Sequence, residues 1–376
     1  MARETTRGAF RTSSAVTISY SELKDKKSDL SAKIKEGFGP NGLGILSVSD
    51  VRNKQDLLHL SPGNHSRDYL RQENLKRELE DPDSRYSFGW SHGKEKLESG
   101  NFDTFKGSFY ANPILDIPTT DISLIQRYPS YCRPNKWPNT SLPELEGAFK
   151  ALAKLIMDVG LLLAYHCDKY VSENKALQQG ESLEDILGRS RCHKGRLLYY
   201  FPRRQSSTEN LTASSWCGWH TDLGSLTGLT CGMFTRNGLE ISPPDSAAGL
   251  YVRTREEEVV KVVFGEDQIA YQIGETTEIL SRGHLCATPH CVKIGLSCLS
   301  IIMALVLQWA GPERRRSCGG ERSTFALFMQ PDWDQQLRFA NEVHLHRELI
   351  PLGGALTFGE YSEMLLDEHY HRRLST

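Results

Sequence analysis

Two histidines and one aspartate in the C-terminal half of the chain have the types and the order of a metal site. The segment WCGWHTDLGSLTGLT contains His220 and Asp222, and His290 ends the later segment HLCATPH. Alternate side chains of an extended segment point the same way, so His220 and Asp222 can reach one ion while Thr221 points elsewhere. Two imidazoles and one carboxylate form the facial triad that binds Fe(II) and leaves coordination positions open.

An arginine further along the chain can complete such a site. Arg322 and Thr324 open the strand-like run RSTFALFMQP. The open positions of an iron can take a 2-oxo acid and dioxygen, and a second carboxylate on that acid needs a partner. The planar guanidinium of arginine matches a carboxylate bidentately, and the threonine hydroxyl adds a donor. A bare His-x-Asp pair is a weak signal, whereas the full order of these residues is far more specific.

Composition limits the classes of function. With 376 residues, 39% of them hydrophobic, the chain can bury at least one sizeable core as two units or one large domain. A formal net charge of -2 gives no whole-chain field that favours nucleic acid or an anionic membrane, so we expect a small-molecule substrate. Nine scattered cysteines and an N-terminus without a signal-peptide pattern predict a location in the cytoplasm or nucleus. We also expect a monomer.

The type of secondary structure that must position these residues changes along the chain, from helices to strands. We expect a region of helices and loops at 1–180 that packs on a strand-rich domain at 181–376. Apolar residues recur at three- and four-residue steps in a long helix, and Ser141 with Glu144 predicts a capping box at its start. The later strands are short and separated by Gly, Pro, Asp or Ser, which predicts a sandwich, a jelly roll or a barrel.

These motifs resemble the Fe(II)/2-oxoglutarate-dependent oxygenases of the isopenicillin N synthase-like family, especially its plant and algal members, over about the whole chain. In that family a strand like GRLLYYFP precedes the HTD motif, and a strand like AGLYVRT follows it. IAYQIGETTEILSRG matches the strand and turn before the last histidine, where HCV replaces HRV. The resemblance implies a mainly β core, a double-stranded β-helix or jelly roll flanked by helices, with the helix at 142–171 as its outer brace.

The resemblance also implies roles for the site residues. His220, Asp222 and His290 would be the catalytic iron ligands, and Arg322 and Thr324 would bind the distal carboxylate of 2-oxoglutarate. The implied activity is that of a dioxygenase, an oxidoreductase that consumes O2 and 2-oxoglutarate, is supported by ascorbate, and oxidises a small organic metabolite with release of succinate and CO2. Hydroxylation is the default outcome.

The sequence departs from the family pattern in three places. Tyr200 aligns with a tyrosine that contacts the co-substrate, but Leu198 replaces the asparagine usual two residues before it. Thr324 replaces a commoner serine and keeps the hydroxyl. An apolar insertion at about 294–316 separates the last histidine from Arg322.

The core of this insertion, GLSCLSIIMALVLQWAG at 295–311, leaves alternatives open. It is shorter than the roughly 20 residues of a membrane span, and a span here would separate strands that share a sheet. We therefore rank an extruded helix or loop first, a segment from an unremoved intron second and a membrane anchor last, and expect no membrane partner. If the insertion displaces Arg322, the chain would be a catalytically impaired binding protein with an oxygenase fold, which is the alternative function.

Other residues have less favoured functional interpretations. A zinc site is disfavoured because its candidate ligands do not have the paired spacing of a structural site: Cys217, His284, Cys286, His290 and Cys291. We expect the aromatic residues Trp90, Phe109 and Tyr110 in the core or a lid, with substrate contact as the minor alternative. We expect the basic run of His193, Lys194 and Arg196 to be a solvated strand entry.

Overall fold

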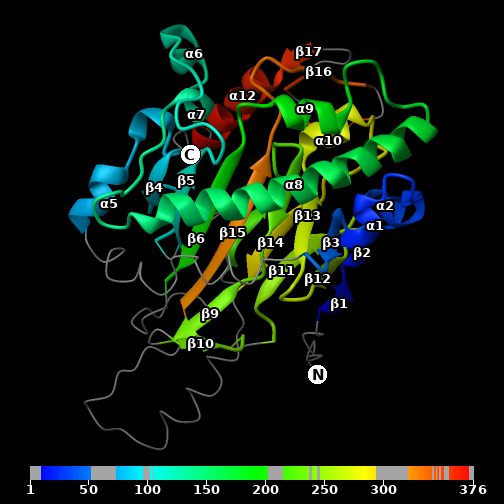
Figure 1. The fold of residues 1–376 in the computed structure, drawn as a ribbon, viewed down its shortest axis with the longest axis horizontal. Coiled ribbons are helices and arrows are strands. Elements are labelled where there is room, and N and C mark those ends of the chain that lie inside the picture. Colours follow the sequence, from blue (N-terminus) through cyan, green and yellow to red (C-terminus); the bar gives the residue numbers. More distant parts are fainter. Residues whose placement is uncertain are drawn as a thin grey trace, which may run out of the picture.

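Two β-sheets lie against each other at the centre of the computed structural model, and a long helix crosses one of them (Figure 1). The structure describes residues 10–51, 73–95, 102–104, 106–201, 215–236, 239–243, 246–293, 321–340, 343, 345–346, 349–350 and 355–371. The apolar insertion predicted at 294–316 lies outside these residues.

The smaller sheet has five strands, in the order β1 (Arg11–Ser14), β12 (Val259–Val263), β11 (Gly249–Arg253), β14 (His290–Lys293) and β7 (Ser215–His220). The main path of the larger sheet is β2 (Val16–Ser19), β3 (Ile45–Ser49), β13 (Ile269–Ile273), β8 (Leu226–Leu229), β15 (Glu321–Met329), β6 (Lys194–Tyr200), β5 (Lys106–Ala111) and β4 (Gly89–His92). Beside this path, β9 (Met233–Arg236) pairs with β15 and with β10 (Leu239–Ile241), and β16 (Gln336–Arg338) pairs separately with β17 (Ala355–Thr357). The four strands β6, β15, β8 and β13 thus face the four strands β7, β14, β11 and β12, which is the jelly roll that the sequence predicts.

The pairing register decides which residues of the larger sheet face the smaller one. Leu198, Tyr200 and Ala326 pack in one apolar cluster with Val292 of the smaller sheet, so they mark the inner face. Because alternate residues of a strand share a face and partners across a ladder share it too, the rest of this inner face follows from the register. Its other members are Lys106, Ser108 and Tyr110 on β5, Arg196 on β6, Arg322 and Thr324 on β15, and Thr227 and Leu229 on β8.

The outer face of the larger sheet is covered by α8 (Glu144–Glu173), which runs across the strands in Figure 1. Its buried stripe packs against apolar residues of the sheet, as in the edge-to-face contact of Phe149 with Phe325 at 4.9 Å. The predicted capping box is wrong. The N-cap is Pro143 without a side-chain hydrogen bond, because residues 138–142 form a turn in which the Ser141 amide donates to Pro138 O.

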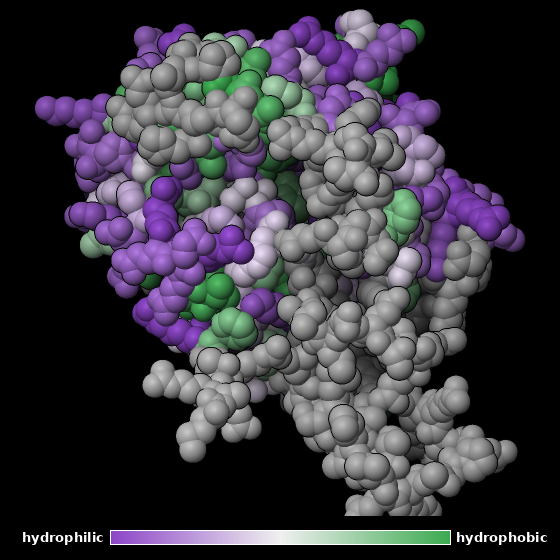
Figure 2. All heavy atoms as spheres, turned by 180° about the vertical axis from the view of Figure 1, so that it is seen from behind, coloured by the Kyte–Doolittle hydropathy of each residue, from purple (hydrophilic) through white to green (hydrophobic). Residues whose placement is uncertain are grey.

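The remaining helices are short and lie around the two sheets. They are α1 (Tyr20–Lys24), α2 (Ser31–Phe38), α5 (Glu73–Leu79), a 3-10 turn (Pro82–Ser84), α6 (Ile122–Arg127), α7 (Pro129–Cys132), α9 (Leu183–Arg189), α10 (Glu275–Leu280) and α12 (Phe358–His371). Thr357 caps α12, because its hydroxyl accepts from the Glu360 amide at 3.2 Å. Seen from the opposite side, hydrophilic residues dominate the described surface and apolar residues show in the recesses between them (Figure 2).

The N-terminal region contributes strands as well as helices. β1 pairs with β12 and β3 pairs with β13, so residues before 180 extend both sheets. The division of the chain at residue 180 stays a prediction. Within the described part of the chain, no helix is both long and apolar enough to cross a membrane.

Candidate metal centre

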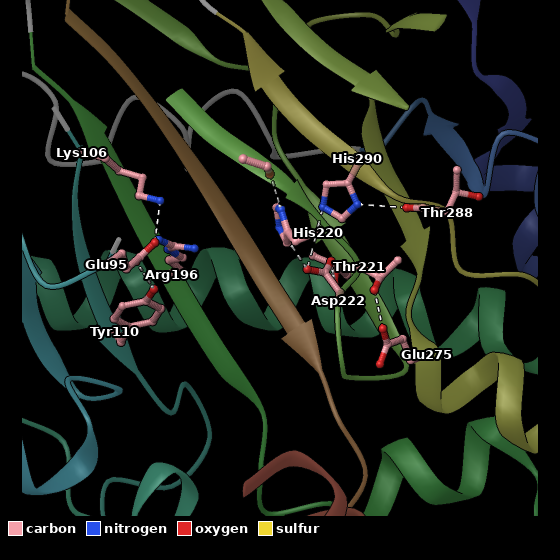
Figure 3. Close-up of polar contacts among 12 residues, drawn as sticks. Glu95, Lys106, Tyr110, Arg196, His220, Thr221, Asp222, Glu275, Thr288 and His290 are labelled. Carbon is pink, nitrogen blue, oxygen red and sulfur yellow. Dashed lines mark hydrogen bonds and ion pairs between the residues drawn. The ribbon is translucent and has the colours of Figure 1, made fainter. Parts of the chain in front are cut away.

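Strands β7 and β14 bring the two predicted histidine ligands together. In the antiparallel pair His290 lies directly opposite His220, and the ring centroids are 4.3 Å apart. Asp222 follows β7 by two residues and turns its carboxylate toward both imidazoles (Figure 3). Residues distant in sequence therefore meet because the last residue of one strand pairs with the first residue of the other.

The distances fit a single divalent ion. Asp222 Oδ1 lies 3.8 Å from His220 Nε2 and 3.9 Å from His290 Nε2. One donor atom from each residue lies within 4.8 Å of the other two, and this trio is the group of candidate metal ligands found among the described residues. Neighbouring ligands of an octahedral ion with bonds of about 2.1 Å lie about 3 Å apart, so small side-chain rotations close the set around an ion.

Backbone carbonyls orient both imidazoles. His220 Nδ1 lies 2.9 Å from Gly218 O, and His290 Nδ1 lies 3.2 Å from Thr288 O. A carbonyl oxygen can only accept, so Nδ1 carries the proton in each ring and Nε2 offers its lone pair toward Asp222. This is the arrangement by which outer partners fix the tautomer of metal-binding histidines.

Burial keeps the inner imidazole neutral. Desolvation and the charge of His220 lower the pKa of His290 to about 4, against the opposing effect of Asp222. A metal binds the neutral form of imidazole, so His290 has its ligand form at neutral pH. Its side chain is 8% exposed and that of His220 is 40% exposed, so the centre opens to solvent on the His220 side.

A hydrogen-bond network behind the centre holds the turn between the ligands. Thr221 points away from the triad's common centre, as predicted, and its hydroxyl donates to Glu275 Oε1. The other oxygen of Glu275 accepts from Tyr361 at 2.6 Å and lies 3.1 Å from His346 Nε2. The Glu275 amide donates to Asp222 O at 2.8 Å.

Sequence reasoning missed Glu275 as part of the site. The signal available to it was an acidic residue two positions after the apolar run IAYQI. In the fold this residue begins a short helix and is 1% exposed. A further contact holds the ligand itself, because the Thr227 hydroxyl donates to Asp222 Oδ2 at 2.6 Å. Oδ1 therefore remains the oxygen that faces the histidines.

The structure also brings together the three residues expected to bind 2-oxoglutarate. Arg322 lies opposite Tyr200 on the inner face, with its guanidinium 5.0 Å from the tyrosine ring. Thr324 lies on the same face one pleat further along β15, and its hydroxyl donates to Thr230 O at 3.0 Å. Arg322 is 9% exposed, so its charge is directed into the interior rather than into bulk water.

One expectation about neighbouring residues is wrong. His193 and Lys194 are buried, at 2% and 7% exposure, and the Arg196 side chain is 12% exposed. They do not form a solvated strand entry, because β6 lies between β15 and β5 rather than at an edge.

Comparison with known proteins shows which sequences and folds the whole chain is similar to. No protein-family model and no curated protein matches the sequence. Among solved structures, a 2OG-Fe(II) oxygenase family protein from Caulobacter crescentus matches with a TM-score of 0.64 and 16% identity, over 95% of this chain and 99% of the other. A full-length Neurospora crassa protein in complex with alpha-KG matches with a TM-score of 0.60 and 16% identity, over 93% and 95% of the two chains.

A third solved structure, JOX2 in complex with 2OG, Fe and JA, matches with a TM-score of 0.59 and 16% identity, over 94% of this chain and 86% of the other. Because the matches include a bacterial and a fungal protein, the likeness does not single out the plant and algal type. Identities this low carry the architecture and not the activity. The chain has the fold of the 2OG-Fe(II) oxygenases.

Proposed function

We propose that the chain is an Fe(II)- and 2-oxoglutarate-dependent dioxygenase that oxidises, by hydroxylation as the default outcome, a small organic molecule. The observation that carries this proposal is the convergence of His220 Nε2, His290 Nε2 and Asp222 Oδ1 within one metal's reach. Two neutral imidazoles and one carboxylate are the donor set of the non-haem Fe(II) oxygenases. The alpha-KG bound to the Neurospora crassa protein and the 2OG and Fe bound to JOX2 support the same pair of cofactors.

Each residue of the site has a separate task in this proposal. The three ligands hold Fe(II) on one side and leave its other side open to ligands. Arg322 and Thr324 bind the distal carboxylate of 2-oxoglutarate from the facing sheet, and Tyr200 packs against the guanidinium and limits its rotation. Fe(II) and 2-oxoglutarate, when bound, supply the chemistry that consumes O2, releases succinate and CO2 and oxidises the substrate.

Burial of the donors serves the same reaction. His290 and Asp222 are 7% and 8% exposed, which limits the access of water to the inner side of the centre. A site closed to water strengthens the interaction of Arg322 with a carboxylate, because fewer waters compete for the guanidinium. Support by ascorbate, a monomeric state and a cytoplasmic or nuclear location belong to the same proposal.

Succinate release tests this function without knowledge of the substrate. The purified protein, loaded anaerobically with Fe(II) and 2-oxoglutarate and then given O2, should release succinate slowly on its own and faster with a pool of metabolites. Zn(II)-loaded protein and Asp222→Ala are the controls, and both should be silent. Iron and 2-oxoglutarate that bind without any succinate would favour the catalytically impaired binding protein, and failure to bind iron would overturn the proposed dioxygenase.

A further inference from the structure

A second polar cluster lies on the inner face of the larger sheet, on the strands next to β15. Lys106 and Tyr110 lie on β5, and Arg196 lies opposite Tyr110 on β6. Glu95 reaches them from the connection after β4, and these side chains point toward one another in Figure 3. With Ser108 of β5 they form what we call the Glu95 cluster.

The Glu95 carboxylate bridges two cations. Lys106 Nζ donates to Oε2 at 2.6 Å, and an Arg196 terminal nitrogen donates to Oε1 at 2.8 Å. Arg196 Nε also donates to Ser108 Oγ at 3.0 Å, which fixes the plane of the guanidinium. Each carboxylate oxygen therefore has its own cation, which is the way in which a planar anion with two oxygens is recognised.

Exposure differs sharply within the cluster. The side chains of Lys106 and Arg196 are 4% and 12% exposed, whereas that of Glu95 is 34% exposed. The cations thus form the floor and the carboxylate lies toward solvent. Glu95 is therefore the most accessible of these three charged side chains.

The cluster lies beside the proposed reaction centre. Lys106 pairs with Tyr200 across β5 and β6, and Tyr200 pairs with Arg322 across β6 and β15, so one row of the inner face links the cluster to the proposed 2-oxoglutarate site. Partial desolvation of the Glu95 carboxylate disfavours its ionised form, but the charges of Arg196 and Lys106 lower its pKa to about 2, so it stays ionised between them.

A purely structural role accounts for the cluster less well. Buried ion pairs have a desolvation cost, and apolar residues of similar volume often stabilise a fold as well or better. Apolar side chains are accommodated on this same face, where Leu198 and Ala326 pack. Two largely buried cations, Lys106 and Arg196, lie on the inner face of the sheet next to the proposed reaction centre. This position favours a role in ligand recognition.

We propose that Lys106 and Arg196 bind a carboxylate of the organic substrate, and that the Glu95 carboxylate holds this place until the substrate displaces it. The inference rests on the proposed function and names its substrate class, organic acids whose oxidised carbon lies toward the iron ligands. Exchange of one carboxylate for another keeps the buried Lys106 and the mostly buried Arg196 compensated, whereas a neutral group in the same place would remove the anion that they share, with Asp103 still 3.7 Å from Lys106.

Matched acids and esters test the inference. Succinate release at saturating 2-oxoglutarate is measured with phenylacetate, cinnamate and octanoate, each beside its methyl ester. At least one acid should stimulate release at a concentration about 10-fold or more below that of its ester. Arg196→Leu and Lys106→Met should raise the half-saturating acid concentration about 100-fold, because each removes one charged partner of the carboxylate. Glu95→Gln should lower it about 10-fold, because the internal competitor is lost.

The control is Lys154→Met, which removes a lysine on the exposed side of α8 that pairs with Asp158. It should leave the acid response unchanged, and thermal melts should show each variant folded. Acids and esters that stimulate equally, or an acid response that survives Arg196→Leu, would overturn the inference and leave the proposed function standing. If the wild type releases no succinate at all, acid binding followed by saturation-transfer NMR in the wild type and Arg196→Leu still decides whether the cluster binds carboxylates.

Discussion

The metal triad (His220, Asp222 and His290) and the Glu95 cluster line the same interior but balance charge in different ways. In the triad, Asp222 Oδ1 lies 3.8 and 3.9 Å from two imidazole nitrogens whose lone pairs face it. In the Glu95 cluster, the carboxylate lies 2.6 and 2.8 Å from two permanent cations. The triad offers three electron-pair donors to a common centre, and the cluster already contains an ion pair.

This difference teaches what limits binding in each place. A divalent cation stabilises the triad by neutralising the carboxylate and accepting the lone pairs, so affinity there depends on how well the ligands are held. A ligand of the Glu95 cluster must first replace the Glu95 carboxylate. Its affinity therefore depends on how strongly Lys106 and Arg196 hold that carboxylate. Substitutions in the triad should therefore change metal affinity. Substitutions in the Glu95 cluster should change the competition between Glu95 and an incoming carboxylate.

The largest effect is expected at the carboxylate of the triad. Asp222→Ala removes the one charged ligand, and we expect Fe(II) affinity to fall by more than about 1,000-fold with loss of all succinate release. Anaerobic titration with Co(II), followed by its visible spectrum, measures the affinity. Asp116→Asn, a change at an exposed carboxylate on the surface, should leave the titration unchanged. Retention of tight metal binding by Asp222→Ala would contradict the assignment of the triad.

Substitutions of Arg322 and of Arg196, the two arginines of the inner face, should distinguish binding of the co-substrate from binding of the substrate. Arg322→Leu should raise the half-saturating 2-oxoglutarate concentration about 100-fold, and Arg322→Lys about 10-fold, because lysine keeps the charge but not the bidentate fork. Metal affinity should stay the same in both variants. Succinate release as a function of 2-oxoglutarate measures the effect, and an unchanged half-saturation in Arg322→Leu would place the co-substrate elsewhere in the interior.

A smaller effect is expected behind the triad. Thr221→Val removes the hydroxyl that donates to Glu275 and holds the turn between His220 and Asp222. Glu275→Gln keeps one acceptor oxygen for Thr221 but puts an NH2 group, which cannot accept, in place of the oxygen that accepts from Tyr361. Losses of outer partners of metal ligands typically cost about 10-fold to 100-fold in metal affinity, so we expect a weaker Co(II) titration at a temperature where both variants stay folded. Thr17→Val, which removes a hydroxyl bonded to Ser47 away from the site, is the matched control.

The last effect is on stability alone and concerns a buried histidine next to β6 that has no role in either region. Burial lowers the pKa of His193 to about 4, so the unfolded chain binds a proton near pH 6.5 that the folded chain does not bind until about pH 4. Stability is therefore lost as the pH falls between these values, by about 2–3 kcal/mol from this group. Urea unfolding at pH 7 and pH 4 should show a smaller acid loss in His193→Gln than in the wild type, and no such change in His92→Gln.

Local sequence patterns predict much of the secondary structure of this protein and the direction of some of its side chains. The short, regularly separated strands predict a sandwich, a jelly roll or a barrel, and the family resemblance implies the jelly roll. The three- and four-residue steps predict α8, and the His-x-Asp spacing predicts that Thr221 points away from its neighbours. These features depend on periodicity, which is a property of consecutive residues. The capping box at Ser141 fails because a turn over residues 138–142 uses the Ser141 amide, which the capping box would need.

Only the tertiary structure decides which distant segments share the inner face. The pairing of β14 with β7 places His290 opposite His220, and the pairing of β5 with β6 places Lys106 and Arg196 around Glu95. Burial is decided in the same way, since β6 is buried by the strands on both of its sides and not by its own composition. Sequence thus determines the types of the ligands and their local spacing, while long-range strand pairing sets their register, their exposure and therefore their charge.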